Sequence, residues 1–195
     1  QSQSKKDLAI VSWGLIAPWL TDTAEAKTSQ SRAINARSES VHEKPTFKDA
    51  FKQRRCLVPA QGYYEWATAL GRYKPKQAFY ISSLDGAQLS IAGIWSSWRG
   101  PNGEVIESAS IITQEAQGEL ATIHSRMPVF MPHDRWDAWL DPENKEIENL
   151  RNLMVVQSPE AIVKAHPVSS HVNSVANNGA QLTQAIELGE PETLF

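Results

Sequence analysis

The sequence predicts an α+β fold: a single domain over residues 1–195, with a curled, mainly antiparallel, barrel-like sheet and short helices inserted between strands. Most segments with hydrophobic periodicity are short and strand-like, with few long helical repeats. The helical segments do not alternate regularly with the strands, which disfavours a doubly wound parallel sheet. A length of 195 residues and a hydrophobic content of 41% suit one domain with a substantial core.

The expected strands are bounded by turn residues. Asp85-Gly86 and Asn102-Gly103 are typical of hairpin turns, and each directly precedes an expected strand. The expected strands are 8–13, 55–59, 62–67, 77–82, 88–95, 105–113 and 161–168.

Helices are expected where apolar residues recur every three or four positions. Thr46 can cap a helix in which Phe47, Ala50 and Phe51 share one face. The other expected elements are helices at 117–122, 133–140 and 147–154, a polar loop at 21–31, a turn at 177–179 and a loose acidic tail at 189–195.

Composition excludes several classes of protein. The net charge of −3 argues against binding nucleic acid through a uniformly basic surface, although arginines at 32, 37, 54, 55 and 126 could line a local groove. No apolar run is long enough to span a bilayer, and Cys56, the only cysteine, cannot form an internal disulfide. We therefore expect a cytoplasmic protein, or a nuclear one in a eukaryote, with no membrane partner. Because the chain begins at Gln1 in a loop-like segment, we expect it to be a fragment.

Glu65 is the first candidate for chemistry. It lies in Gly62-Tyr63-Tyr64-Glu65-Trp66, where strand alternation puts Tyr63 and Glu65 on one face and Tyr64 and Trp66 on the other. Aromatic neighbours solvate a carboxylate poorly and raise its pKa, which suits it to general acid–base catalysis near neutral pH. The alternative is a strand glutamate that pairs with an arginine or faces water.

His124 is the second candidate, in Ile123-His124-Ser125-Arg126-Met127-Pro128. Pro128 favours an extended backbone at Met127, so this segment is expected to be a rigid polar loop. His124 could carry protons and Arg126 could bind an anion, although a histidine that packs or caps a turn and an arginine in an ion pair are the plainer alternatives.

Other candidates are ambiguous in isolation. Asn35 could be an ordinary turn asparagine, and a phosphate role for Arg126 is favoured over an ion pair if it lies near Arg37. Trp13 is expected to pack in the core, whereas Trp19 could stack on a nucleobase. Cys56 lies in a dense apolar strand and is expected to be inert, and neither the histidine spacing nor one cysteine fits a metal site, so we expect no metal or cofactor.

Several segments, taken in order and spacing, resemble the SOS response-associated peptidase (SRAP) family. The resemblance extends from about Trp13 to Leu182. The segments are Trp13–Trp19 (WGLIAPW), Ile34–Glu39 (INARSE), Phe47–Phe51 (FKDAF), Arg55–Trp66 (RCLVPAQGYYEW), Ala92–Trp95 (AGIW), Ile112–Thr113 (IT), Ile123–Pro128 (IHSRMP) and His166–Ser169 (HPVS).

The resemblance implies a sensor of abasic sites in single-stranded DNA. Such proteins carry an N-terminal cysteine, exposed when the initiator methionine is removed autocatalytically. Its amine forms a Schiff base with the abasic aldehyde, and its thiolate then closes a thiazolidine ring, which leaves a stable DNA–protein crosslink. Lyase and self-processing activities are associated with this chemistry, and we expect a monomer.

The same resemblance implies roles for individual residues. Glu65 would be the acid–base group for imine formation, His124 the proton carrier for sugar-ring opening, and Asn35 a group that positions the amine or sugar. The implied DNA contacts are Arg37, Arg126, Trp19, Trp13 and Thr113.

The chain departs from this pattern at two places. The N-terminal cysteine, with the glycine and arginine that follow it, is absent from the sequence. In Ser40–Thr46, where the family often carries another DNA-contacting arginine, the nearest residues are Lys44 and Pro45. Two other functions stay open: a non-catalytic reader of modified or single-stranded DNA, and a peptidase that acts on other proteins.

Overall fold

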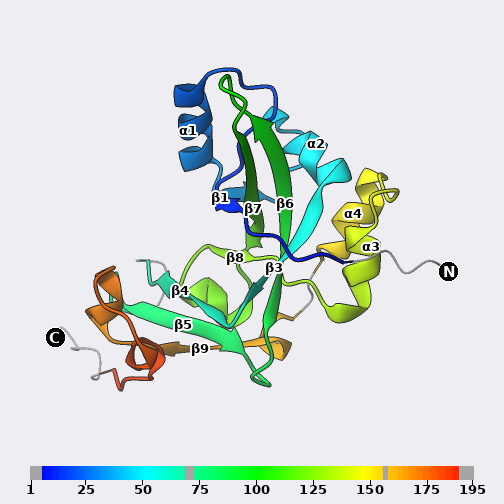
Figure 1. Cartoon of the computed structure of the whole chain (residues 1–195). Coiled ribbons are helices and arrows are strands. Elements are labelled where there is room, and N and C mark those ends of the chain that lie inside the picture. The colour runs from blue at the N-terminus through cyan, green and yellow to red at the C-terminus, as the bar shows by residue number, and fades with distance from the viewer. Residues whose placement is uncertain (1–5, 69–72, 156–157, 189–195) are drawn as a thin grey trace. The chain divides into compact units, whose positions relative to one another are not determined.

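The computed structural model describes residues 6–68, 73–155 and 158–188, and its described elements form two compact units (Figure 1). The first unit comprises Gln1–Pro59, Ser90–Gln114 and Pro128–Gln157. The second comprises Ala60–Leu89, Glu115–Met127 and Ser158–Phe195. The single domain expected over 1–195 stays a prediction.

The first unit is built on a sheet with the strand order β1-β7-β6-β3. Its central hairpin joins β6 (Leu89–Arg99) to β7 (Val105–Glu115) in antiparallel register, and the turn uses Gly103 at φ 85°. The short strands β1 (Ser12–Trp13) and β2 (Asn35–Arg37) pair with β7 in parallel. The remaining members are β3 (Arg55–Ala60) and β8 (Arg126–Pro128), of which β8 also pairs with β7.

Helices cover this sheet on both sides: α1 (Thr23–Arg32) on one, and α2 (Pro45–Gln53), α3 (Trp136–Leu140) and α4 (Ile147–Leu153) on the other (Figure 1). Phe51, Trp139 and Leu150 from the second group pack with Ile94 and Ile112 of the central hairpin. On the other side of the sheet, Ala26 of α1 packs with Ile16 and Trp98. This burial of apolar surface is the main stabilising contribution to the unit.

Arg55 ties two helix ends to β3. Its side chain is 6% exposed and donates from Nε to the Trp139 carbonyl at 2.6 Å and from Nη1 to the Phe51 and Lys52 carbonyls at 2.9 and 2.6 Å. Nη2 donates to the Asp141 carbonyl. The guanidinium thus satisfies carbonyl groups that the ends of α2 and α3 would otherwise leave without a donor.

The second unit contains a three-stranded antiparallel sheet with the order β4-β5-β9. The strands are β4 (Gly62–Trp66), β5 (Ala78–Ser83) and β9 (Val163–Pro167). The register pairs Glu65 with Phe79 and Tyr64 with Tyr80. Short 3₁₀ helices surround it at Gly118–Thr122, Pro159–Ala161, Ser170–Asn173 and Ala180–Thr183, and a further one, His133–Arg135, precedes α3 in the first unit.

The α+β class is confirmed, and the sheets are not closed into a barrel. The polar loop expected at 21–31 was wrong, because α1 begins after the Asp22 cap, whose carboxylate accepts from the Ala24 and Glu25 amides. The second helix starts at Pro45, so Lys44 rather than Thr46 is its N-cap. Of the strand expected at 8–13, only Ser12–Trp13 pairs, and Leu8 and Ile10 are exposed. The tail expected at 189–195 lies outside the described residues.

No helix in the described ranges is long and apolar enough to cross a membrane.

Candidate active site

Glu65 lies on β4, with its side chain 27% exposed. Burial raises the pKa of its carboxyl group, while nearby His124 and a hydrogen bond from the Trp66 amide, at 3.2 Å from Oε1, lower it to a smaller extent. The net shift is upward. A carboxyl group with a raised pKa can exchange protons closer to neutral pH than an exposed glutamate can.

Backbone hydrogen bonds of the segment that contains His124 place this residue beside β4. The 3₁₀ helix Gly118–Thr122 precedes it, and the His124 amide donates to the Leu120 carbonyl at 3.0 Å. The Thr68 amide, just beyond β4, donates to the Ile123 carbonyl at 2.9 Å. As a result His124 Nδ1 lies 3.9 Å from Glu65 Oε2, with the histidine side chain 31% exposed.

The Arg126 backbone offers Nδ1 of His124 both a hydrogen-bond donor and an acceptor. Nδ1 lies 3.1 Å from the Arg126 amide nitrogen and 3.2 Å from the Arg126 carbonyl oxygen. Because a main-chain amide can only donate, its hydrogen bond to Nδ1, the shorter of the two, favours the neutral tautomer with the proton on Nε2. In the protonated ring, Nδ1 can donate to the carbonyl instead.

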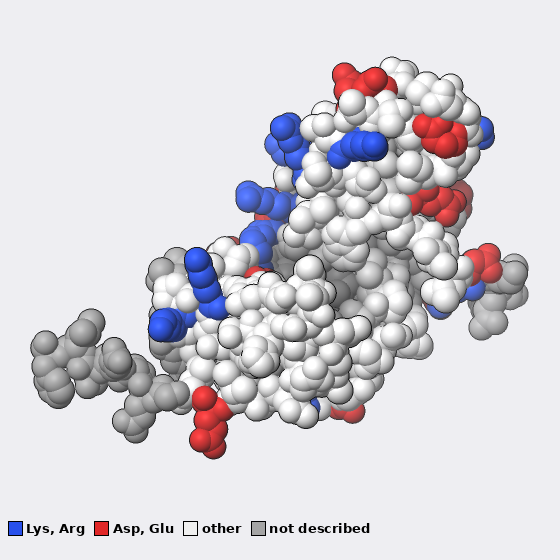
Figure 2. Space-filling model, turned by 60° about the vertical axis from the view of Figure 1, so that its left-hand side comes forward, with Lys and Arg blue, Asp and Glu red and all other residues white. Residues whose placement is uncertain are grey.

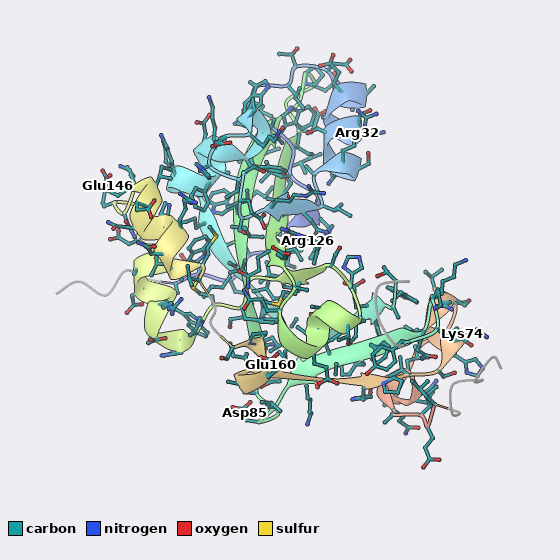
Figure 3. The ribbon with its side chains drawn as sticks, turned by 180° about the vertical axis from the view of Figure 1, so that it is seen from behind. Arg32, Lys74, Asp85, Arg126, Glu146 and Glu160 are labelled. Atoms are coloured by element: carbon teal, nitrogen blue, oxygen red, sulfur yellow. The ribbon has the colours of Figure 1, made fainter. Side chains whose placement is uncertain are left out.

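Glu65 and His124 are therefore close without sharing a hydrogen bond, because 3.9 Å exceeds hydrogen-bond length. The arrangement offers a carboxyl group and an imidazole Nε2 as two separate proton carriers. Arg126, which Figure 3 labels, follows His124 by two residues and supplies a positive charge to the same segment.

Tyr63 is an additional member of this cluster to which the sequence assigned no role. It shares the Glu65 face of β4, two residues earlier. Burial, and to a smaller extent the negative charge of Glu65, raise the pKa of the Tyr63 hydroxyl, which stays a neutral phenol. Strand alternation was the signal that could have identified it.

The first unit holds a second group of candidates on β2 and β7. Asn35 and Arg37 are exposed at either side of the fully buried Ala36. Arg37 pairs in register with Thr113, which is 8% exposed, and Asn35 pairs with Ile111. Asn35, Arg37 and Thr113 thus come together on two paired strands of the first unit.

The two tryptophans of the opening segment are both half exposed. Trp13 is 54% exposed, so its expected place in the core was wrong: β1 is a two-residue edge strand whose residues are both open to solvent. Trp19 is 50% exposed, consistent with an indole that can stack on a ligand.

Cys56 has the properties of a structural thiol. Its Sγ lies so close to Gly93 that a side chain there would meet it at 2.9 Å. Burial raises the pKa of the thiol to about 12, so thiolate is scarce at neutral pH. Within residues 6–68, 73–155 and 158–188, no group of three or more histidine, cysteine or acidic residues could hold a metal ion.

On the face that Figure 2 shows, the visible lysine and arginine side chains do not form one continuous basic surface. Figure 2 shows lysine and arginine side chains gathered in a few places on the face in view, acidic side chains at others, and broad uncharged areas between them. This distribution fits the net charge of −3 and favours local anion contacts.

Comparison with known proteins gives consistent matches. The sequence model of the family described as SOS response associated peptidase (SRAP) matches residues 1–175. Abasic site processing protein YoaM from Bacillus subtilis is 34% identical over 182 residues, which cover 93% of this chain and 77% of the relative. Abasic site processing protein HMCES from Gallus gallus is 31% identical over 207 residues, covering 97% of this chain and 60% of the relative.

Solved structures share the fold. A protein from Bacteroides thetaiotaomicron matches with a TM-score of 0.80 and 27% identity, covering 90% of this chain and 75% of that one. A protein from Bordetella bronchiseptica matches with a TM-score of 0.72 and 28% identity, covering 83% and 77%.

Proposed function

Because the chain belongs to the SOS response associated peptidase (SRAP) family, we propose that it processes abasic sites in DNA, and that it does so by covalent capture on a single strand. Relatives that share about a third of its residues are named abasic site processing proteins. The observation that carries the chemistry is the Glu65–His124 pair, two proton carriers 3.9 Å apart that do not share a proton. Capture of a sugar aldehyde needs two separate proton transfers of this kind.

The first transfer opens the sugar. The hydroxyl on C1′ of the cyclic abasic sugar loses its proton, the bond from C1′ to the ring oxygen breaks, and that oxygen gains a proton. We assign proton delivery to Nε2–H of His124, the position that the Arg126 amide favours. The product is a free aldehyde.

The second transfer forms the imine. An N-terminal α-amine, with an ordinary pKa near 8, attacks the aldehyde carbon and gives a carbinolamine. Glu65 in its protonated form donates to the departing hydroxyl, so that one water leaves as the C=N bond forms, and its carboxylate then takes the remaining proton from nitrogen to leave a neutral imine. The raised pKa of Glu65 makes its protonated form more available near neutral pH.

A cysteine thiolate then adds to the imine carbon, and the imine nitrogen takes up a proton, closing a thiazolidine ring. In this proposal the amine and the thiol belong to one N-terminal cysteine, which is freed by removal of the initiator methionine. Cys56 is unsuited to the role because burial raises the pKa of its thiol to about 12.

The proposed DNA contacts are residues of both units. Arg37 and, in the second unit, Arg126 bind phosphates, for which a planar guanidinium is suited. Asn35 positions the amine or the sugar through its amide. Trp13, Trp19 and Thr113 complete the assigned DNA contacts, and the half-exposed indoles offer stacking surfaces.

The test uses the full-length protein and a single-stranded oligonucleotide with one abasic site. The expected product is a heat-stable adduct whose mass is that of protein plus DNA minus one water. Glu65→Gln should slow its formation by about 10²–10⁴-fold, the usual cost of losing an acid–base group, while Glu107→Gln, at an exposed strand glutamate, should not. Reversible, salt-sensitive binding with no adduct would support a non-catalytic reader instead.

A further inference from the structure

A pocket in the first unit has no assigned role. It has a volume of about 520 Å³, a size usual for small-molecule sites. The turn that contains Trp19 and Leu20 forms one wall, and Glu25, Thr28 and Ser29 of α1 form another; Ala17, Ala24 and Thr46 complete the lining.

The wall that carries Trp19 is held in place. The Leu20 amide donates to the Ala17 carbonyl at 3.2 Å, and the Leu20 carbonyl accepts from the indole nitrogen of buried Trp98 at 2.7 Å. Trp19 itself is 50% exposed. A fixed turn thus presents a flat aromatic side chain to the pocket, a surface on which a planar ring can stack.

The opposite wall is rich in hydrogen-bond acceptors. The Thr28 hydroxyl donates its hydrogen to the Ala24 carbonyl at 2.9 Å, and the Ser29 hydroxyl donates to the Leu15 carbonyl at 3.3 Å. Each hydroxyl has one hydrogen, so both present only lone pairs to a ligand. The Glu25 carboxylate adds two further acceptor oxygens.

We propose that this pocket binds an unpaired nucleobase that carries an exocyclic amino group, as cytosine and adenine do. The base stacks on Trp19, and its amino hydrogens bond to Glu25 and to the hydroxyl oxygens of Thr28 and Ser29. Glutamate accepting from the amino group of cytosine is an established pairing in DNA recognition. Thymine has no amino group, and its single edge donor, N3–H, lies between two carbonyl oxygens, which these acceptors repel.

The inference rests on the proposed function, since a strand held at an abasic site supplies unpaired bases. It adds a preference for base identity, which phosphate contacts through arginine do not give. The base preference does not depend on the covalent step, so base preference and crosslinking can be tested separately.

The test measures equilibrium binding of the full-length protein by fluorescence anisotropy. The probe is a thymidine oligonucleotide with a tetrahydrofuran abasic analogue, which has no aldehyde and cannot crosslink. Single thymidines on either side of the analogue are replaced by cytidine or deoxyadenosine. At one position the replacement should tighten binding about tenfold, the effect typical of one good base contact.

Glu25→Gln should reduce that ratio, because the amide hydrogens of glutamine can also donate to thymine oxygens. Glu107→Gln removes the same charge from an exposed strand position outside the pocket lining and should leave the ratio unchanged. Equal binding of all probes by the wild type, or an unchanged ratio in Glu25→Gln, would overturn the inference.

Crosslinking is assayed in parallel with an authentic abasic site. A wild-type protein that crosslinks but shows no base preference overturns this inference alone. A protein that shows the preference but never crosslinks overturns the covalent chemistry alone.

Discussion

Glu65→Gln should separate stability from activity. The Glu65 side chain is 27% exposed, and the hydrogen bond that it accepts from the Trp66 amide, at 3.2 Å, is long. Burial is the largest influence on its pKa, which lies above the ordinary value of about 4.3. The charged carboxylate is therefore under-compensated in the folded protein at neutral pH.

A raised pKa gives stability that is full at low pH and is lost as the pH rises through the folded-state pKa. Glutamine keeps the shape and the acceptor for Trp66 but carries no charge. We expect Glu65→Gln to raise the free energy of unfolding at pH 8 by about 1 kcal/mol, the lower end of the range for neutralising buried charges, because a quarter of the side chain still meets water. Near pH 4 the gain should vanish.

Urea unfolding at both pH values measures the gain, and the rate of adduct formation measures activity. Glu107→Gln serves as the control in both assays, since it removes the same charge from an exposed strand position. A variant that crosslinks at the wild-type rate would remove Glu65 from the mechanism. A variant less stable than wild type at pH 8 would refute the electrostatic reasoning.

Four further outcomes are expected. Nitrogen NMR should find neutral His124 protonated on Nε2; Arg126→Ala should preserve this tautomer because it keeps the amide hydrogen, whereas Arg126→Pro should abolish the preference. Arg55→Met should lower the free energy of unfolding by about 3 kcal/mol or more in urea titrations, because main-chain carbonyls lose a charged donor, and a near-neutral result would contradict that role. Arg37→Gln should reduce the slope of log affinity against log salt by about 0.7, the value for one phosphate contact on a single strand, and an unchanged slope would exclude the contact. Cys56→Ala should crosslink at the wild-type rate, and loss of the adduct would make this thiol the nucleophile.

The sequence predicted well the features that depend on local order. The alternation of side chains along β4 predicted that Tyr63 and Glu65 share one face of the strand. The aromatic neighbours of Glu65 predicted that its pKa is raised. The sequence could not give the distance from Glu65 to His124, because it depends on the Thr68–Ile123 hydrogen bond between segments more than fifty residues apart. Long-range pairings of this kind have no signal in one sequence.

The incorrect predictions for α1 and for the burial of Trp13 have identifiable physical causes. Only Ala26 of α1 is buried, so the helix lacks the apolar stripe that periodicity detects. The Asp22 cap, followed by Ala24, Glu25 and Ala26, was the available signal. Trp13 was expected in the core because tryptophan usually buries, yet its strand is too short and too near the edge to cover it.

The orientation of His124 also bears on the alternative of a peptidase that acts on other proteins. In a nucleophile–histidine–acid triad, the histidine donates from Nδ1–H to the carboxylate, which orients the ring and stabilises its protonated form. Here Nδ1 accepts from the Arg126 amide at 3.1 Å, and Glu65 lies beyond hydrogen-bond distance at 3.9 Å. Glu65 is thus not the orienting acid of a triad. The two side chains share no hydrogen bond, which suits the proposed reaction, in which ring opening and loss of water are separate steps.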